Sequence, residues 1–236
     1  MIRITKKPGI PLLLALIFTA SCTSPAEDAS GTSGEKMKDA GYRRYQIESG
    51  MVEYAVSGAQ QGTESLYFDK WGMREAKYTR TEISIAGVTQ KTNQLTLMDG
   101  EWIYNIDLDK KTGTKIKNPI FDIIAARSDS KDFGELGLQM LKDMGAEKTG
   151  SEEVAGKPCD IWEAKSLGSK SWVWNSIALK TEVNLAGIRA TTVATKVDDG
   201  ASIPEDKFTL PSDATITESP AVDKMMEKMK KRMGQK

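Results

Sequence analysis

The sequence predicts a mainly β domain with a few helices, in which a curved antiparallel sheet is covered by an α-helix. From Tyr45 onward, apolar and polar residues alternate in short runs, which is typical of strands that bury one face. One of the short links between these runs, Asp99-Gly100, is among the strongest hairpin signals. After Asn118-Pro119 the apolar period changes from two residues to about 3.6, which indicates a helix.

Residues 1–21 have the layout of a secretory signal peptide: basic residues, an apolar run over residues 10–20, and small residues before Cys22. The apolar run is too short to span a bilayer. The segment Phe18-Thr19-Ala20-Ser21-Cys22 resembles a bacterial lipobox, in which the cysteine receives acyl chains such as palmitate and becomes the mature N-terminus. The alternative is plain cleavage by the general signal peptidase. Because Thr23 rather than an aspartate follows, we expect an outer-membrane lipoprotein that faces the periplasm.

Residues 22–41 are expected to form the lipidated cysteine and a flexible tether. The stretch 23–38 is rich in Ser, Gly, Ala and Glu and has no aromatic residue, so it cannot bury a core. The remaining chain fits one β-domain over residues 42–214, without an internal repeat. Because 33 basic residues balance 33 acidic ones, there is no electrostatic case for a nucleic-acid partner.

The alternating runs predict two groups of strands, one before and one after the helix in the sequence. A change of phase around Gly50 suggests a β-bulge there. In the run after Asp99-Gly100, Trp102, Tyr104 and Ile106 share one face. The first group of strands is expected at residues 45–56, 63–71, 74–81, 81–89, 90–98, 101–107 and 114–117. The second group is expected at 147–154, 159–165, 170–174, 177–185 and 189–197.

The main helix is predicted over residues 133–144, where Phe133, Leu136 and Met140 lie on one face and Gly145 can end the helix. A second, shorter helix is predicted at 120–127. Residues 215–236 are expected to form a basic, Met-rich C-terminal helix. Its apolar stripe could dock on the sheet or on a membrane surface, or its thioethers could bind Cu(I). The stripe consists of Val222, Met225, Met226, Met229 and Met233.

Catalytic, metal and cofactor motifs are absent from the sequence. The chain has no histidine, which removes Ser-His-Asp and Cys-His nucleophile systems and histidine zinc sites. Cys159 is expected to be a small buried residue, with a regulatory thiol as the alternative. No glycine spacing matches a phosphate-binding loop, and adjacent carboxylates such as Glu152-Glu153 point to opposite sides of a strand. The sequence therefore predicts no enzyme, no cofactor and no metal.

The five tryptophans all lie within predicted strands. A sheet that curls into an incomplete barrel has a filled core and a concave face that can hold an apolar ligand. The tryptophans could therefore be ordinary core residues or the walls of a ligand cavity. The cavity candidates are Trp71, Trp102, Trp162, Trp172, Trp174, Phe133, Leu136 and Met140.

Five stretches, in this order, carry a resemblance to the LolA/LolB-like superfamily of bacterial envelope proteins: YFDKWGMREAKY, GEWIYNIDLDKKTGTKIKNP, AGKPCDIWEAK, SWVWNSIALKTEV and IPEDKFTLP. The chain looks especially like its lipoprotein relatives, over about residues 42–211. The resemblance implies an incomplete antiparallel β-barrel closed by helices around a hydrophobic cavity, with residues 133–144 as a lid. In the carrier members an arginine holds the lid, but no arginine of this chain aligns with that role.

The function that follows is non-catalytic: an envelope lipoprotein that binds a lipid or acyl chain in an apolar half-barrel cavity, as a carrier, sorting or sensing protein. The alternative is an outer-membrane-anchored scaffold whose core is filled by its own side chains and whose surface recruits an envelope protein partner.

Overall fold

The computed structural model describes residues 41–85, 88–118, 132–185 and 187–218 of the chain. Several predicted features lie outside these residues: the signal peptide, Cys22, nearly all of the tether, the helix at 120–127 and the methionine stripe. Among the described residues, no helix combines the length and the apolar content that crossing a bilayer requires.

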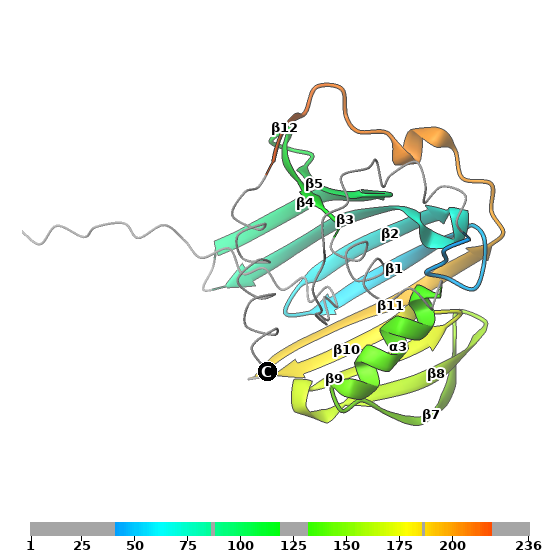
Figure 1. Ribbon diagram of the computed structural model, residues 1–236. Helices are drawn as coiled ribbons and strands as arrows, with labels where there is room; N and C mark the ends of the chain where they lie inside the picture. The colour runs from blue at the N-terminus through cyan, green and yellow to red at the C-terminus, as the bar shows by residue number, and fades with distance from the viewer. Residues whose placement is uncertain (1–40, 86–87, 119–131, 186, 219–236) are drawn as a thin grey trace, which may run out of the picture.

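Twelve strands form one curved sheet in the described part of the chain, and its two edges do not meet (Figure 1). The first six strands are β1 (Gly50–Gly58), β2 (Gln61–Asp69), β3 (Arg74–Ile85), β4 (Val88–Asp99), β5 (Trp102–Asp107) and β6 (Thr112–Lys117). The others are β7 (Glu147–Val154), β8 (Lys157–Ala164), β9 (Ser169–Trp174), β10 (Ile177–Leu185), β11 (Ile188–Asp199) and β12 (Thr215–Glu218).

The strand order is β12-β6-β5-β4-β3-β2-β1-β11-β10-β9-β8-β7. All neighbours are antiparallel except β12 and β6. Helix α3 (Phe133–Asp143) lies against the β8–β10 part of the sheet. The predicted class, a mainly β, incomplete antiparallel barrel covered by a helix, is confirmed.

Tight turns give the sheet its mostly sequential order. The predicted Asp99-Gly100 turn joins β4 to β5, with Gly100 at φ 58°. Between β9 and β10, Asn175 and Ser176 take φ values of 48° and 66°, as a two-residue hairpin turn that matches strand twist requires. The predicted bulge at Gly50 is wrong. The register shift lies at Glu53/Tyr54, in the pairing of β1 with β11.

Side chains from both faces of β2 contribute to two separate apolar cores. Leu66 and Phe68 belong to the first core, whereas Tyr67, between them, packs against the second. The buried members of the first core are Tyr45, Val52, Tyr54, Leu66, Phe68, Val154, Cys159, Ile161, Trp172, Ile177, Leu179 and Ala194. The prediction that Cys159 is buried is confirmed.

The second core lies on the other face of β3–β5 and is covered by the segment that follows β11. Its buried residues are Ala76, Leu95, Leu97, Ile106 and Phe208. Phe208 ends a short 3-10 helix, Glu205–Phe208, and the Arg74 guanidinium lies 4.2 Å from the centre of its ring. The chain then reaches β12 at the far edge of the sheet (Figure 1). Because β12 begins at Thr215, the ordered domain continues past the predicted end at 214, and residues 215–218 are strand rather than helix.

Tyr54 makes folding stability sensitive to alkaline pH. The hydroxyl donates a hydrogen bond to the Ala178 carbonyl at 3.1 Å. Burial, and then the negative charges of Glu75 and Glu64, raises the pKa of Tyr54 far above its ordinary value of 10.0. The unfolded chain loses this proton near pH 10 while the folded chain keeps it. We therefore expect the free energy of unfolding to fall above about pH 10, by about 1.4 kcal/mol per pH unit for this tyrosine.

Urea unfolding between about pH 8 and pH 11 measures this slope. Tyr54→Phe removes the titrating group and should flatten the slope above about pH 10. An unchanged slope in the variant would assign the alkaline loss of stability to other groups.

Candidate functional site

The face of β1–β6 that carries Val52, Leu66 and Phe68 is called the inner face here, because these residues share a core with β7–β10. The strand register aligns its side chains in three rows that run across β2–β6. The first row is Phe68, Glu75, Met98, Ile103 and Ile116. The second is Leu66, Lys77, Thr96, Asn105 and Thr114. The third begins with Glu64, Thr79 and Gln94.

The first row leaves apolar surface unused by the two cores. Met98, Ile103 and Ile116 are cross-strand neighbours on β4, β5 and β6. None of them belongs to either core, although Met98 is buried and the two isoleucines are half-buried. The inner face therefore has an apolar strip beyond the two cores, and its partly exposed members are Ile103 and Ile116.

The second and third rows form a patch, the polar patch, made of Glu64, Lys77, Thr79, Gln94, Thr96 and Asn105. All six residues are half-buried. Thr79 Oγ1 donates to Glu64 Oε1 at 3.3 Å, and Thr96 Oγ1 donates to Asn105 Oδ1 at 3.1 Å. Lys77 Nζ lies 3.8 Å from Glu64 Oε2, which is an ion pair longer than a hydrogen bond. The patch carries one positive and one negative charge, so its net charge is zero.

A segment that precedes β1, called the strap and comprising residues 42–48, closes the first-row end of the inner face. Arg44 Nη1 lies 2.9 Å from Glu75 Oε2 and 3.5 Å from Met98 Sδ. The Tyr45 hydroxyl also donates to Glu75 Oε2, and its ring packs edge-on to Phe68 at 4.7 Å. A carboxylate on β3 thus fixes two consecutive side chains of the strap.

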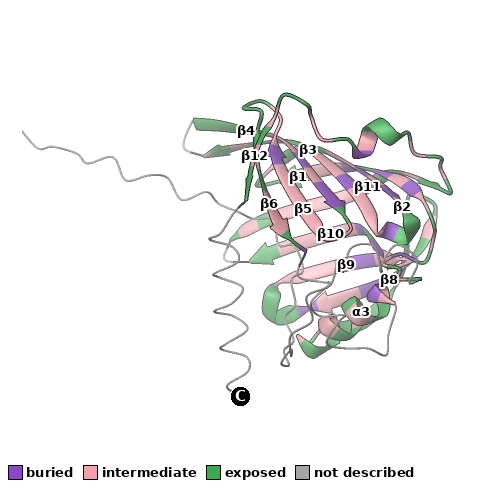
Figure 2. Ribbon diagram, turned by 45° about the horizontal axis from the view of Figure 1, so that its top comes forward, coloured by how far each residue is buried: buried purple, intermediate pink, exposed green. Residues whose placement is uncertain are grey.

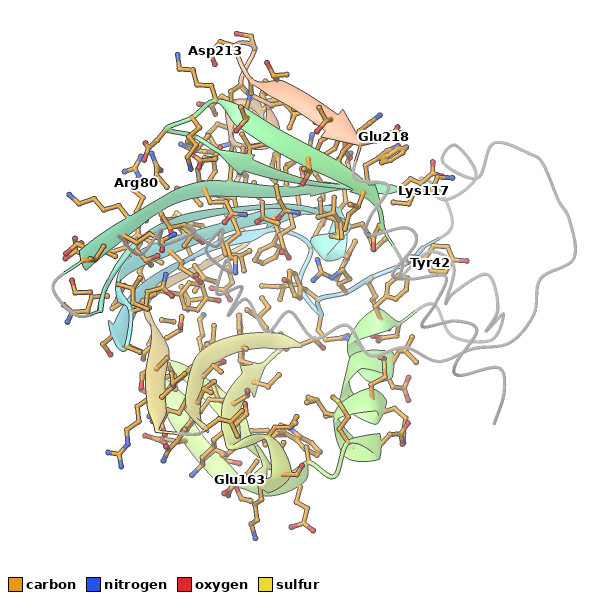
Figure 3. All side chains as sticks on the ribbon, turned by 90° about the vertical axis from the view of Figure 1, so that its left-hand side faces the viewer. Tyr42, Arg80, Lys117, Glu163, Asp213 and Glu218 are labelled. Atoms are coloured by element: carbon orange, nitrogen blue, oxygen red, sulfur yellow. The ribbon has the colours of Figure 1, made fainter. Side chains whose placement is uncertain are left out.

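The strap also holds the start of α3. Phe133 N donates to the Arg43 carbonyl at 2.8 Å, and Arg43 Nε lies 3.3 Å from Asp132 Oδ2. Tyr42 packs on Phe133 with ring centres 5.6 Å apart, beside the start of the helix in Figure 3. The sequence pattern identified no arginine for holding the helix. A sequence signal for the anchoring residue at the helix start was overlooked. Asp132 is followed three residues later by Glu135, which is the spacing of a capping box.

Asp132 caps α3, since its carboxylate accepts a hydrogen bond from Glu135 N at 3.1 Å. We expect Asp132→Ala to lower the free energy of unfolding by about 1 kcal/mol and to raise amide exchange across α3. Asp132→Asn, which can still cap, should keep most of the protection. Faster exchange spread over the whole sheet, rather than confined to α3, would contradict a local role.

The same carboxyl makes the cap sensitive to acid. Burial alone would raise its pKa, but hydrogen bonds from Gln46 and the Glu135 amide, with the Arg43 charge, hold the pKa of Asp132 below its ordinary 3.8. A depressed folded pKa stabilises the protein above the ordinary value. That contribution is lost as the pH falls through the lower, folded value.

The apolar side chains of α3 are only partly covered. Phe133 is buried, whereas Leu136 and Met140 are half-buried and belong to neither core. Figure 2 shows that most of the α3 ribbon is coloured intermediate or exposed. A Cβ on Gly134 would meet Ser176 Oγ at 2.2 Å, so the helix start sits tightly on the β9–β10 turn. The three predicted helix residues therefore lie on one helix, with the first fixed and the others partly open.

The tryptophans of β8 and β9 separate into two environments. Trp172 is 3% exposed in the first core, its Nε1 donates to Glu152 Oε2 at 2.6 Å, and Trp174 packs against the same core. Trp162 points to the opposite face, because Ile161 is the cross-strand partner of Trp172. The ammonium of Lys142 on α3 lies 5.6 Å from the Trp162 ring.

The other two tryptophans lie away from these three. Trp102 is half-buried on the outer face, where the ammonium of Lys115 lies 4.4 Å from its ring. Trp71 is 38% exposed in a 3-10 turn, and its carbonyl accepts hydrogen bonds from the amides of Arg44 and Tyr45. The structure thus brings Trp172 and Trp174 together and places Trp162 by α3. The role of all five as cavity walls stays a prediction.

The described residues contain no group of three or more His, Cys, Asp or Glu side chains placed to hold a metal ion. The arrangement on the inner face can bind through apolar contact at the strip and through hydrogen bonds at the polar patch.

No family profile matches the chain, and no curated protein matches it. Solved structures with a similar chain path include an uncharacterized conserved protein from Thermus thermophilus, with 8% identity, a TM-score of 0.43, and coverage of 72% of this chain and 90% of that chain. The complex of Pseudomonas aeruginosa MucA/MucB matches with 14% identity and a TM-score of 0.40, over 70% of this chain and 56% of the matched chain. LprF from Mycobacterium bovis matches with 10% identity and a TM-score of 0.31, over 71% of this chain and 90% of the matched chain. At these values, none of the three carries a functional conclusion to this chain.

Proposed function

We propose that the protein is a non-catalytic binding protein of the bacterial envelope that holds a lipid or acyl chain on its inner face. The observation that carries the proposal is the strip of Met98, Ile103 and Ile116. Among the described residues its members belong to neither core, and the two isoleucines are half-buried. Leu136 and Met140 of α3 are further half-buried apolar side chains that belong to neither core. Apolar contact with an acyl chain would bury this surface, at about 25 cal/mol per Å².

The test uses the full-length chain carrying Cys22→Ser, purified without detergent and studied by native mass spectrometry with lipid extraction. We expect a co-purifying acyl lipid, and we expect Ile103→Glu to lose it because a charge on the strip opposes acyl contact. Leu185→Glu is the matched control, since Leu185 is 48% exposed at the end of β10, away from the strip. An empty protein that also fails to take up added lysolipid would exclude the lipid-binding function.

A second candidate is a scaffold that recruits an envelope protein partner. The tight filling of both cores favours it, because Phe68, Leu179 and Ile106 are each 0% exposed. In that case Ile103→Glu would leave lipid content unchanged.

The proposal includes anchoring through Cys22, which lies in the lipobox-like segment before the tether. Labelled palmitate should enter the wild-type chain and be absent from Cys22→Ser. Equal release of both chains from membranes without detergent would indicate plain signal-peptide cleavage.

A further inference from the structure

The polar patch lies directly beside the apolar strip on the inner face. Thr96 and Met98 are two residues apart on β4, as are Asn105 and Ile103 on β5. Two residues of a strand span about 7 Å. An acyl chain on the strip would therefore bring the head of the same lipid onto the patch.

The two charges of the patch are available to a ligand. Lys77 and Glu64 side chains are 34% and 19% exposed, and their 3.8 Å separation leaves hydrogen-bonding capacity on both. The neighbouring pair on this face, Arg44 and Glu75, is already joined by a hydrogen bond at 2.9 Å and is occupied by the strap. Lys77 and Glu64 are thus the charges that a ligand on the patch would meet.

We propose that the polar patch selects a zwitterionic lipid head that carries a phosphate and a primary ammonium, an inference that rests on the proposed lipid-binding function. Lys77 pairs with the phosphate, and Glu64 accepts hydrogen bonds from the ammonium. A head that carries only negative charge could pair its phosphate with Lys77 but would bring no cation to Glu64. The repulsion between its phosphate and the Glu64 carboxylate opposes its binding.

The acceptors of the patch distinguish a primary from a quaternary ammonium. Glu64, Thr79 and Asn105 offer carboxylate, hydroxyl and amide oxygens, which a primary ammonium can use as a hydrogen-bond donor. A quaternary ammonium has no N–H and is recognised by aromatic cages. Among the described residues, the aromatic side chain paired across the strands with Glu64 is Tyr54, which is 7% exposed and donates its hydroxyl to the Ala178 carbonyl.

The experiment is a competition among lysolipids that share one acyl chain and differ in the head: phosphoethanolamine, phosphocholine and phosphoglycerol. Native mass spectrometry of the full-length Cys22→Ser chain reports the bound fraction of each. We expect about a tenfold preference for phosphoethanolamine over each of the others, the size of effect that one lost charged hydrogen bond gives.

The charge-neutralising double variant Glu64→Gln/Lys77→Gln should bind all three lysolipids about equally. Lys180→Gln/Glu182→Gln is the matched control, because it neutralises another ion pair, 2.8 Å apart on β10, and should keep the preference. Equal binding of the three heads by the wild-type chain would overturn the head-group inference while leaving the lipid-binding function in place. Failure of every lysolipid to bind would overturn both.

Discussion

Phe68→Ala should lower the free energy of unfolding by about 3–5 kcal/mol, a large fraction of the stability of a typical domain. Phe68 is 0% exposed, and its ring packs against Tyr45 on the strap. The backbone of β1 approaches the ring so closely that a Cβ on Gly50 would lie 2.8 Å from Phe68 Cζ. Truncation therefore leaves a cavity that Gly50, without a side chain, cannot fill.

Urea unfolding measures the loss, and Phe68→Leu is the control. Leucine keeps most of the buried volume, so it should cost less than half as much as alanine. Equal losses for both variants would show that the aromatic contact with Tyr45, rather than the filled volume, provides the stability.

Glu75→Ala should lower the free energy of unfolding by about 2–4 kcal/mol, because it leaves two partly buried donors without their acceptor. Arg44 and Tyr45 both donate to Glu75 Oε2, and the side chains of Arg44 and Glu75 are only 25% and 17% exposed. The strap should loosen, which amide exchange in residues 42–48 would report.

A double-mutant cycle separates this pair from general damage. Arg44→Met removes the stranded charge, so in the Glu75→Ala background it should cost at least about 1 kcal/mol less than in the wild-type chain. Additive losses would contradict an energetic link between strap and sheet.

The local features of the fold were predictable from the sequence because they depend on neighbouring residues. The Asp99-Gly100 turn, the helix at Phe133 and the alternation in most strands each follow from a short stretch of chain. Alternation also identified which residues share a face. Trp102, Tyr104 and Ile106 are an example, since the last two belong to or pack against the second core.

Alternation does not tell which of the two faces lies inside the curve. In β3 and β4 the apolar residues, such as Ala76 and Leu95, face outward under the segment that follows β11. The polar alternate residues, such as Lys77 and Thr96, face inward. The sequence-based prediction placed apolar side chains on the concave side and therefore missed the polar patch.

The pairings between strands that are far apart in the chain also could not be predicted from the sequence. The pairing of β1 with β11 joins residues such as Gly50 and Asp199, and no local pattern records it. The strap was missed for the same reason. Its partners include Asn175 and Asp132, each far away in the chain.

The covering of the outer face by residues 203–216 has a consequence for the order in which the protein folds. Ala76 and Leu95 are synthesised early, but the residues that cover them, including Phe208, are synthesised near the end of the domain. The pairing of β1 in the middle of the sheet likewise cannot form until β11 has been synthesised. A chain that closes both cores through such distant contacts folds slowly, in milliseconds to seconds, and only once nearly all of it is available. Until then the β3–β5 sheet presents an apolar surface that invites association with other chains.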